Sequence, residues 1–258
     1  MRKLILILNL VILFTSSLYS QNSGWSFDAS AGAAFPIGKF GSKNINDPNA
    51  SFAKTGPMLN LCFDYNLKKY FGFSFLLSGQ KNNVDTKAID SKLSAAYPDY
   101  EFYSTSNNWL SLKFMGGVYT CLSFDKEDRI SLTARVMIGV LKTSNYNFSQ
   151  TQRINPKDTA NLGNGTVVIE SYEADWVSLK TAFTYLVGIG LKYNLNKKIS
   201  IKTNIDYSAA TLSFPRFDYF NSGGALGTTI NPPTQTTVAY PSQPFSTINW
   251  SVGVGINL

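Results

Sequence analysis

The feature that most constrains the fold is a strict alternation between large apolar and small polar side chains. It is clearest over residues 248–258, where the apolar members are Ile248, Trp250, Val252, Val254, Ile256 and Leu258. The positions between them hold only Asn, Ser or Gly. Because successive side chains of a β-strand point to opposite faces, this segment is predicted to be a strand with one apolar and one small polar face.

The same alternation recurs in earlier segments. Each is at least as long as the roughly 9–11 residues that a tilted strand needs to cross a bilayer. The expected strands cover residues 24–36, 56–67, 70–80, 108–120, 129–143, 175–194 and 198–213, followed by the last strand. A helix is expected inside one connection, from Thr86 to Ala96. The sequence therefore predicts an all-β fold with eight antiparallel strands in up-and-down order.

The connections between these strands are short at one end and long at the other. Residues 66–69 and 194–198 are tight turns, and residues 121–128 form a moderately short, charged turn. Long connections rich in Asn, Ser, Thr, Pro and Gly cover residues 37–55, 81–107, 144–174 and 214–245. This asymmetry is typical of a transmembrane β-barrel with short periplasmic turns and long extracellular loops.

Alternation alone does not say which face of a barrel points outward, because a soluble lipocalin-like barrel has the same period. A soluble barrel needs a charged outer face, yet only 15% of this chain is charged, against roughly 25% in ordinary soluble domains. The apolar faces also carry aromatic side chains that would overfill a narrow eight-stranded lumen. A transmembrane barrel whose apolar faces contact lipid is therefore favoured, with a soluble carrier as the alternative.

The first residues have the order of a secretory signal peptide. Arg2 and Lys3 precede an apolar run from Leu4 to Phe14, broken by Asn9, and small residues follow up to Ser20. The expected organisation is a signal peptide over residues 1–20 and one barrel domain over 21–258; the alternative is a buried N-terminal helix. Removing two basic residues and no acidic one lowers the formal net charge from +7 to +5. This modest excess does not indicate nucleic-acid binding.

With this signal peptide, eight alternating strands and the ending Trp250-x-Val252-x-Val254-x-Ile256-x-Leu258, the mature chain resembles the small bacterial outer-membrane β-barrel family. That family includes the transmembrane domain of OmpA, OmpX and the PorT-like barrels. The resemblance implies a location in the outer membrane and recognition of the last strand by the barrel-assembly machinery, although Leu258 stands where the family usually has Phe. It does not define function, because the family includes adhesins, structural anchors, narrow pores and secretion components.

Composition argues against catalysis. The chain has no histidine, which excludes mechanisms that use Ser-His-Asp, Cys-His or His-bound metal. Its two cysteines, Cys62 and Cys121, are too few for a four-cysteine zinc site and are expected to be reduced. The pairs Gly188/Gly190 and Gly253/Gly255 lack the remainder of a phosphate-binding loop and fit small inward-facing positions of a crowded lumen. We expect a protein that is not an enzyme and has no metal or cofactor.

Alternation places a set of ionisable side chains on the inner faces of the strands. They are Asp28, Asp64, Lys113, Arg135, Lys180, Lys192, Lys202 and Asp206. Arg135 is the expected centre of a charge network, with Asp64 and Asp206 as partners, because its guanidinium can pair with two carboxylates. Lys192 lies beside a turn and is expected to be solvated. Two interpretations stay open: salt bridges that plug the lumen, or a narrow pore that attracts small anions.

Aromatic side chains gather in two of the long loops. They are Tyr97, Tyr100, Phe102 and Tyr103 in the second loop, and Phe217, Tyr219, Phe220 and Tyr240 in the fourth. Large rigid rings suit recognition of an extracellular or envelope protein partner, or they pack the loops together. The hypotheses are thus a structural or surface-interaction barrel, a narrow pore for small solutes, and a subunit of a secretion or assembly complex.

Overall fold

The computed structural model describes residues 24–47, 49–68, 70–98, 100–125, 127–144, 148–154, 170–174, 180–213, 217–222, 234–238 and 242–257. The expected signal peptide lies outside these residues and stays a prediction. None of the helices in the described ranges is long and apolar enough to cross a membrane.

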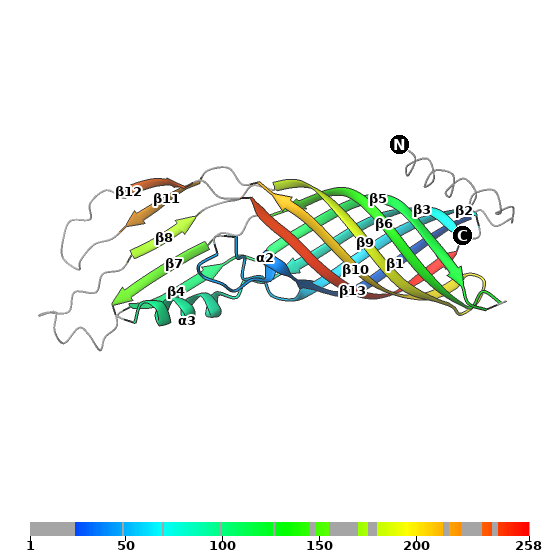
Figure 1. Ribbon diagram of the computed structural model, residues 1–258, viewed down its shortest axis with the longest axis horizontal. Coiled ribbons are helices and arrows are strands. Elements are labelled where there is room, and N and C mark those ends of the chain that lie inside the picture. Colours follow the sequence, from blue (N-terminus) through cyan, green and yellow to red (C-terminus); the bar gives the residue numbers. More distant parts are fainter. Residues whose placement is uncertain are drawn as a thin grey trace, which may run out of the picture.

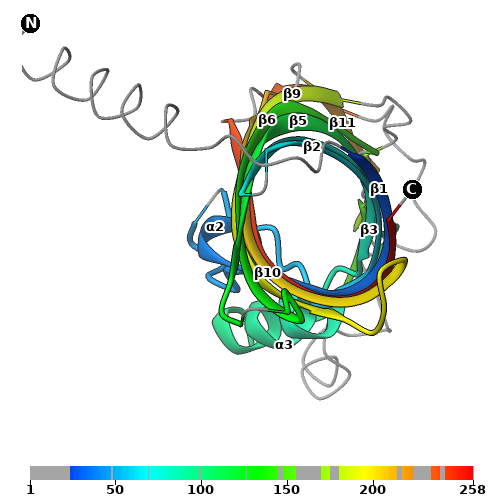
Figure 2. The ribbon, with the colours of Figure 1, turned by 90° about the vertical axis from the view of Figure 1, so that its right-hand side faces the viewer.

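Eight strands form a closed antiparallel barrel, as predicted. They are β1 (Gly24–Pro36), β2 (Gly56–Lys68), β3 (Phe71–Asn82), β5 (Trp109–Ser123), β6 (Ile130–Thr143), β9 (Lys180–Asn194), β10 (Ile199–Leu212) and β13 (Gln243–Asn257). Each strand pairs with its neighbours in chain order, and β1 closes the ring against β13, with Ala31 opposite Val252. Figure 2 shows the closed ring along the barrel axis. Every strand backbone is therefore paired within the barrel.

The apolar faces of these strands point outward. Leu59 is 67% exposed, Phe183 65% and Ile138 58%. Polar side chains at alternate positions point inward and are buried, among them Ser74, Thr184 and Asn249. This arrangement is the inverse of a soluble barrel, in which polar side chains face the water outside. In water, the outer face of this barrel would expose its apolar side chains while its polar side chains stayed buried.

The described parts of the long connections contain two helices and five further strands. The predicted helix is confirmed as α3 (Thr86–Ala96), and a four-residue helix, α2 (Gly38–Gly41), lies in the first long connection. The extra strands are β4 (Tyr100–Ser106), β7 (Phe148–Ile154), β8 (Glu170–Ala174), β11 (Phe217–Ser222) and β12 (Thr234–Val238).

These five strands form a second antiparallel sheet in the order β12-β11-β8-β7-β4, which projects beyond one end of the barrel (Figure 1). We call it the extracellular sheet, because it is built from the long connections. The sequence did not predict it, since each strand is short and the sheet is completed only by pairing between different connections, β4 with β7 and β8 with β11.

Candidate functional site

Glycines on β9 and β13 make room for the charged side chains of the lumen. Gly188 is the register partner of both Arg135 on β6 and Asp206 on β10. A Cβ atom at Gly188 would lie 1.9 Å from Asp206 Oδ1, and one at Gly255 would lie 2.1 Å from Asp28 Oδ1. Charged side chains on the two strands that flank β9 can therefore meet in the lumen over Gly188.

Arg135 and Asp206 form a bidentate pair across Gly188. Arg135 Nε donates to Asp206 Oδ1 at 2.9 Å, and Nη2 donates to Oδ2 at 2.6 Å. The two side chains are 13% and 2% exposed. The planar fork matches the carboxylate and fixes both side chains in one geometry.

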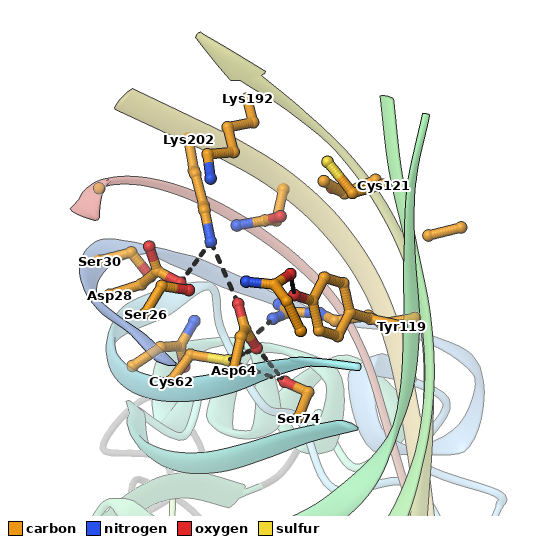
Figure 3. Close-up of a pocket in the computed structure, with 17 residues that line it drawn as sticks. Ser26, Asp28, Ser30, Cys62, Asp64, Ser74, Tyr119, Cys121, Lys192 and Lys202 are labelled. Atoms are coloured by element: carbon orange, nitrogen blue, oxygen red, sulfur yellow. Dashed lines mark hydrogen bonds and ion pairs between the residues drawn. The ribbon is translucent and has the colours of Figure 1, made fainter. Parts of the chain in front are cut away.

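Lys202, rather than Arg135, joins two carboxylates (Figure 3). Its ammonium group pairs with Asp28 and lies 3.2 Å from Asp64 Oδ2. Asp64 Oδ1 accepts hydrogen bonds from the Ser74 hydroxyl at 2.6 Å and from the Cys62 thiol at 3.2 Å. Of the two partners expected for Arg135, Asp206 pairs with it, whereas the carboxylate of Asp64 pairs with Lys202 instead.

A cavity of about 50 Å³, lined mostly by residues with polar or charged side chains, lies beside this network, toward the short turns. Lys192, Lys202 and Tyr119 contribute to its lining (Figure 3). Arg135 lines it as well. Among the described residues, the buried Asp28 Oδ1 has no hydrogen-bond partner. A polar cavity of this size holds a few water molecules, which can satisfy such an atom.

The ligand atoms of Asp28, Cys62 and Asp64 lie within 4.8 Å of one another, which is close enough for a metal ion. The surrounding charges do not fit a cation. The ammonium group of Lys202 already pairs with both carboxylates, and Arg135 Nη1 lies 3.9 Å from Cys62 Sγ. A divalent cation would have to displace one positive group and remain close to another.

Lys113 lies apart from the carboxylates, toward the long connections. Its side chain is buried, and its ammonium group donates to Gln80 Oε1 at 2.9 Å and to Ser208 Oγ at 2.7 Å. The group also lies 5.9 Å from the centre of the Phe245 ring. Sequence reasoning missed these neutral partners, because Gln80 and Ser208 carry no charge pattern that marks them.

An apolar cluster fills the extracellular end of the lumen. Phe40 of α2 is fully buried, with its ring centre 4.1 Å from that of Phe245 and 5.6 Å from that of Trp109. Leu141 and Leu212 complete the core of this cluster. Phe40 was not among the expected functional residues; the only signal was an aromatic residue within the polar first connection.

The first connection is also tied to α3 by Asp85. This residue caps the N-terminus of α3 by accepting from the Ala88 amide, and its carboxylate lies 2.5 Å from Lys43 Nζ and 3.3 Å from Lys54 Nζ. The hydrogen bond from Lys43, with those from Lys54 and Ala88, lowers the pKa of Asp85 below its usual range against a smaller opposing effect of burial. The carboxylate thus attaches the first long connection, through Lys43 and Lys54, to the N-terminus of α3.

Two further expected lumen lysines, in addition to Lys113, lie outside the network. Lys180 is at the extracellular end of β9, opposite Thr143, and forms no ion pair with another described residue. Lys192 donates to Asn257 Oδ1 at 3.3 Å near the short turns. The network of the described lumen consists of Arg135 with Asp206 and of Lys202 with Asp28 and Asp64.

The aromatic loop residues differ in accessibility. Tyr97 and Tyr103 are 56% and 50% exposed, whereas Phe102 is buried and packs near Tyr97 and Tyr100. The expectation that Phe102 is available for recognition is therefore wrong. For Phe217, Tyr219 and Phe220 only the backbone of β11 is described, and Tyr240 lies outside the described residues.

The last strand presents its apolar side chains to the outside. Trp250, Val252, Val254 and Ile256 are all exposed, and Leu258 lies outside the described residues. Recognition of this strand by the barrel-assembly machinery stays a proposal.

These observations define the class of the protein. A closed sheet leaves no unpaired edge, its outer surface is apolar over most of the length of the strands, and most of the charged side chains described on these strands lie inside. Such a surface is stable in contact with lipid hydrocarbon. The chain is a small, eight-stranded β-barrel protein of the bacterial outer membrane.

Known proteins similar to this chain are found among solved structures. No family model and no curated protein matches the chain. Among solved structures it is similar to Neisserial surface protein A, with 10% identity, a TM-score of 0.44 and coverage of 92% of this chain and 99% of that one. It is also similar to the attachment invasion locus protein Ail of Yersinia pestis, at 10% identity, a TM-score of 0.41 and coverage of 92% and 100%. These scores are low, so the class rests on the barrel itself.

Proposed function

We propose that the protein is a non-enzymatic surface-interaction protein, in which the barrel is the anchor and the extracellular sheet contacts an extracellular or envelope protein. The observation that carries the proposal is the extracellular sheet itself. Three connections supply its strands, and it projects beyond the barrel rather than lying over the lumen mouth (Figure 1).

The form of this sheet suits recognition of a protein. Its edge strands are β4, beside which α3 packs, and β12, and an uncovered edge strand offers backbone donors and acceptors to another chain (Figure 1). Tyr97 and Tyr103 are exposed beside or on β4, and tyrosine rings give large contact area at low entropic cost. Both features are available to a partner outside the cell.

The lumen supports an anchor better than a pore. Two groups of ion pairs engage the three carboxylates, and the cluster around Phe40 and Trp109 occupies the extracellular end. Buried charges that are paired and hydrogen-bonded favour one fixed arrangement of the strands. We therefore assign the charge network to stabilising the barrel.

A truncated variant tests this proposal. Thr143 and Lys180 are register partners on β6 and β9, so an Asn-Gly link between them should close a hairpin while removing β7 and β8 from the centre of the sheet. Cells that express the wild type should adhere to surfaces coated with fibronectin, laminin or albumin, and cells with the truncated protein should not.

The matched control replaces residues 195–198, at the opposite end of the barrel, by Asn-Gly. This variant should bind as the wild type does, and all three proteins should show heat-dependent mobility in detergent electrophoresis. The proposal is refuted if wild-type cells bind no better than cells with an empty vector, or if the truncated protein binds equally well.

A further inference from the structure

The outward faces of the eight barrel strands carry two charged side chains among the described residues. They are Lys81 on β3 and Lys142 on β6, and both are exposed. Every other outward position on these strands whose side chain is described is uncharged. A charge on the lipid side of a barrel is unfavourable near the bilayer centre, so these exceptions call for a compensating environment.

The two lysines lie on the same side of the barrel. Lys81 is the register partner of Leu110 on β5, and Lys142 is the register partner of Leu112 on the same strand. They therefore flank β5, two residues apart in register. Neighbouring strands are about 4.8 Å apart, so their flexible side chains can reach one group placed over β5.

Both lysines also lie at the extracellular boundary of the membrane. Lys81 lies ten residues after Phe71, the first residue of β3. Lys142 lies twelve residues after Ile130, the first residue of β6. With a rise of about 3.3 Å per residue and a tilt of about 40°, they stand about 25 Å and 30 Å above the periplasmic ends of their strands. This is the height of the apolar band, where a lysine can extend its ammonium group into the headgroup region.

We propose that Lys81 and Lys142 bind the phosphorylated headgroup of a lipid in the outer leaflet. Neither lysine forms an ion pair with a described residue, and the outward faces around them hold no described carboxylate. Thr181, the register partner of Lys142, is exposed beside it and adds a hydroxyl donor. Two ammonium groups without acidic neighbours complement a phosphate.

The surface between the lysines selects a lipid over a soluble anion. Leu110 is 59% exposed and Leu112 39% exposed, and they form an apolar floor against which an acyl chain can pack. A free phosphate gains nothing from this floor, whereas a lipid gains contact with both its headgroup and its chain. The inference does not depend on the function proposed for the extracellular sheet.

The test counts bound lipid by native mass spectrometry on the folded, full-length barrel in detergent. The probes are diphosphorylated lipid A and its dephosphorylated form. The wild type should retain the diphosphorylated lipid preferentially. We expect the single variants K81Q and K142Q to weaken retention about fivefold each and the double variant about thirtyfold, which corresponds to about 1 kcal/mol per charge.

Two controls make the result specific. The double variant K197Q/K198Q removes the same charge at the short turns and should bind as the wild type does, and K81R/K142R should preserve binding. Millimolar inorganic phosphate should not displace the lipid; displacement would assign the site to a free anion and overturn the proposal. Equal retention of the two lipids by the wild type, or unchanged retention by K81Q/K142Q, would also overturn it.

Discussion

Replacing Arg135 by methionine tests the structural role of the charge network most directly. The variant keeps an unbranched side chain in the lumen but removes the guanidinium group. Asp206 then loses two hydrogen bonds, of 2.9 Å and 2.6 Å. Its side chain, which is 2% exposed in the wild type, remains inside the barrel. Its carboxylate becomes a buried charge without a direct partner.

Removing one partner of a buried ion pair costs about 3–5 kcal/mol of the free energy of unfolding. The polar cavity beside Arg135 admits water that can solvate the remaining carboxylate in part, so we expect a loss of about 3 kcal/mol. The double variant R135M/D206N removes both charges and keeps the shape of the Asp206 side chain above Gly188. It should recover more than half of the loss.

The free energy of unfolding can be measured by urea titration of the barrel in phospholipid vesicles, followed by tryptophan fluorescence and by mobility in unheated electrophoresis. Lys192→Met is the matched control, because Lys192 donates to the neutral Asn257 at 3.3 Å, and it should cost about 1 kcal/mol or less. The reasoning is refuted if R135M is as stable as the wild type, or if the losses of R135M and D206N simply add in the double variant.

Further predictions concern the glycines, the covered end of the lumen and the segment tied to α3. Gly188→Ala should destabilise the barrel in the same assay, because its Cβ would lie 1.9 Å from Asp206 Oδ1, whereas Gly79→Ala, whose nearest contact is 3.9 Å away, should be neutral. Phe40→Ala should cost about 3–5 kcal/mol of local packing and speed proteolysis within residues 37–55; equal cleavage rates would contradict this. Planar-bilayer recordings should find the wild type and R135A non-conducting, because the Phe40 cluster closes the lumen independently of Arg135; a resolved channel current in the wild type would contradict this. The lowered pKa of Asp85 means that its stabilisation is complete above the ordinary value of 3.8 and is lost as the pH falls through the lowered value. Proteolysis of residues 37–55 should therefore rise only in strong acid, and Asp85→Asn should remove this step.

The candidate site was predictable in part. Alternation correctly placed Arg135, Asp206, Lys202, Asp28 and Asp64 on the inner face, because parity along a strand fixes which side a residue faces. The pairing among them was not predictable, since it depends on the register between strands. Arg135 meets Asp206 only because Gly188 stands between them in register.

Buried aromatic residues show a second limit. Tyr103 and Phe102 are adjacent in one aromatic segment, yet Tyr103 is exposed and Phe102 is buried. Phe40 lies in a polar connection, and only the meeting of α2 with β5 and β13 makes it part of a core. Composition could not distinguish these environments.

The sequence by itself determined that the chain forms eight barrel strands with apolar exteriors, because a period of two residues is a local property that each segment carries alone. It also determined α3, through an eleven-residue segment that the structure bears out. The tertiary structure alone decided which charges pair, which end of the lumen is filled and how five short strands combine into the extracellular sheet. These features depend on contacts between segments far apart in the chain, and such contacts exist only once the closed ring fixes the register and height of every strand.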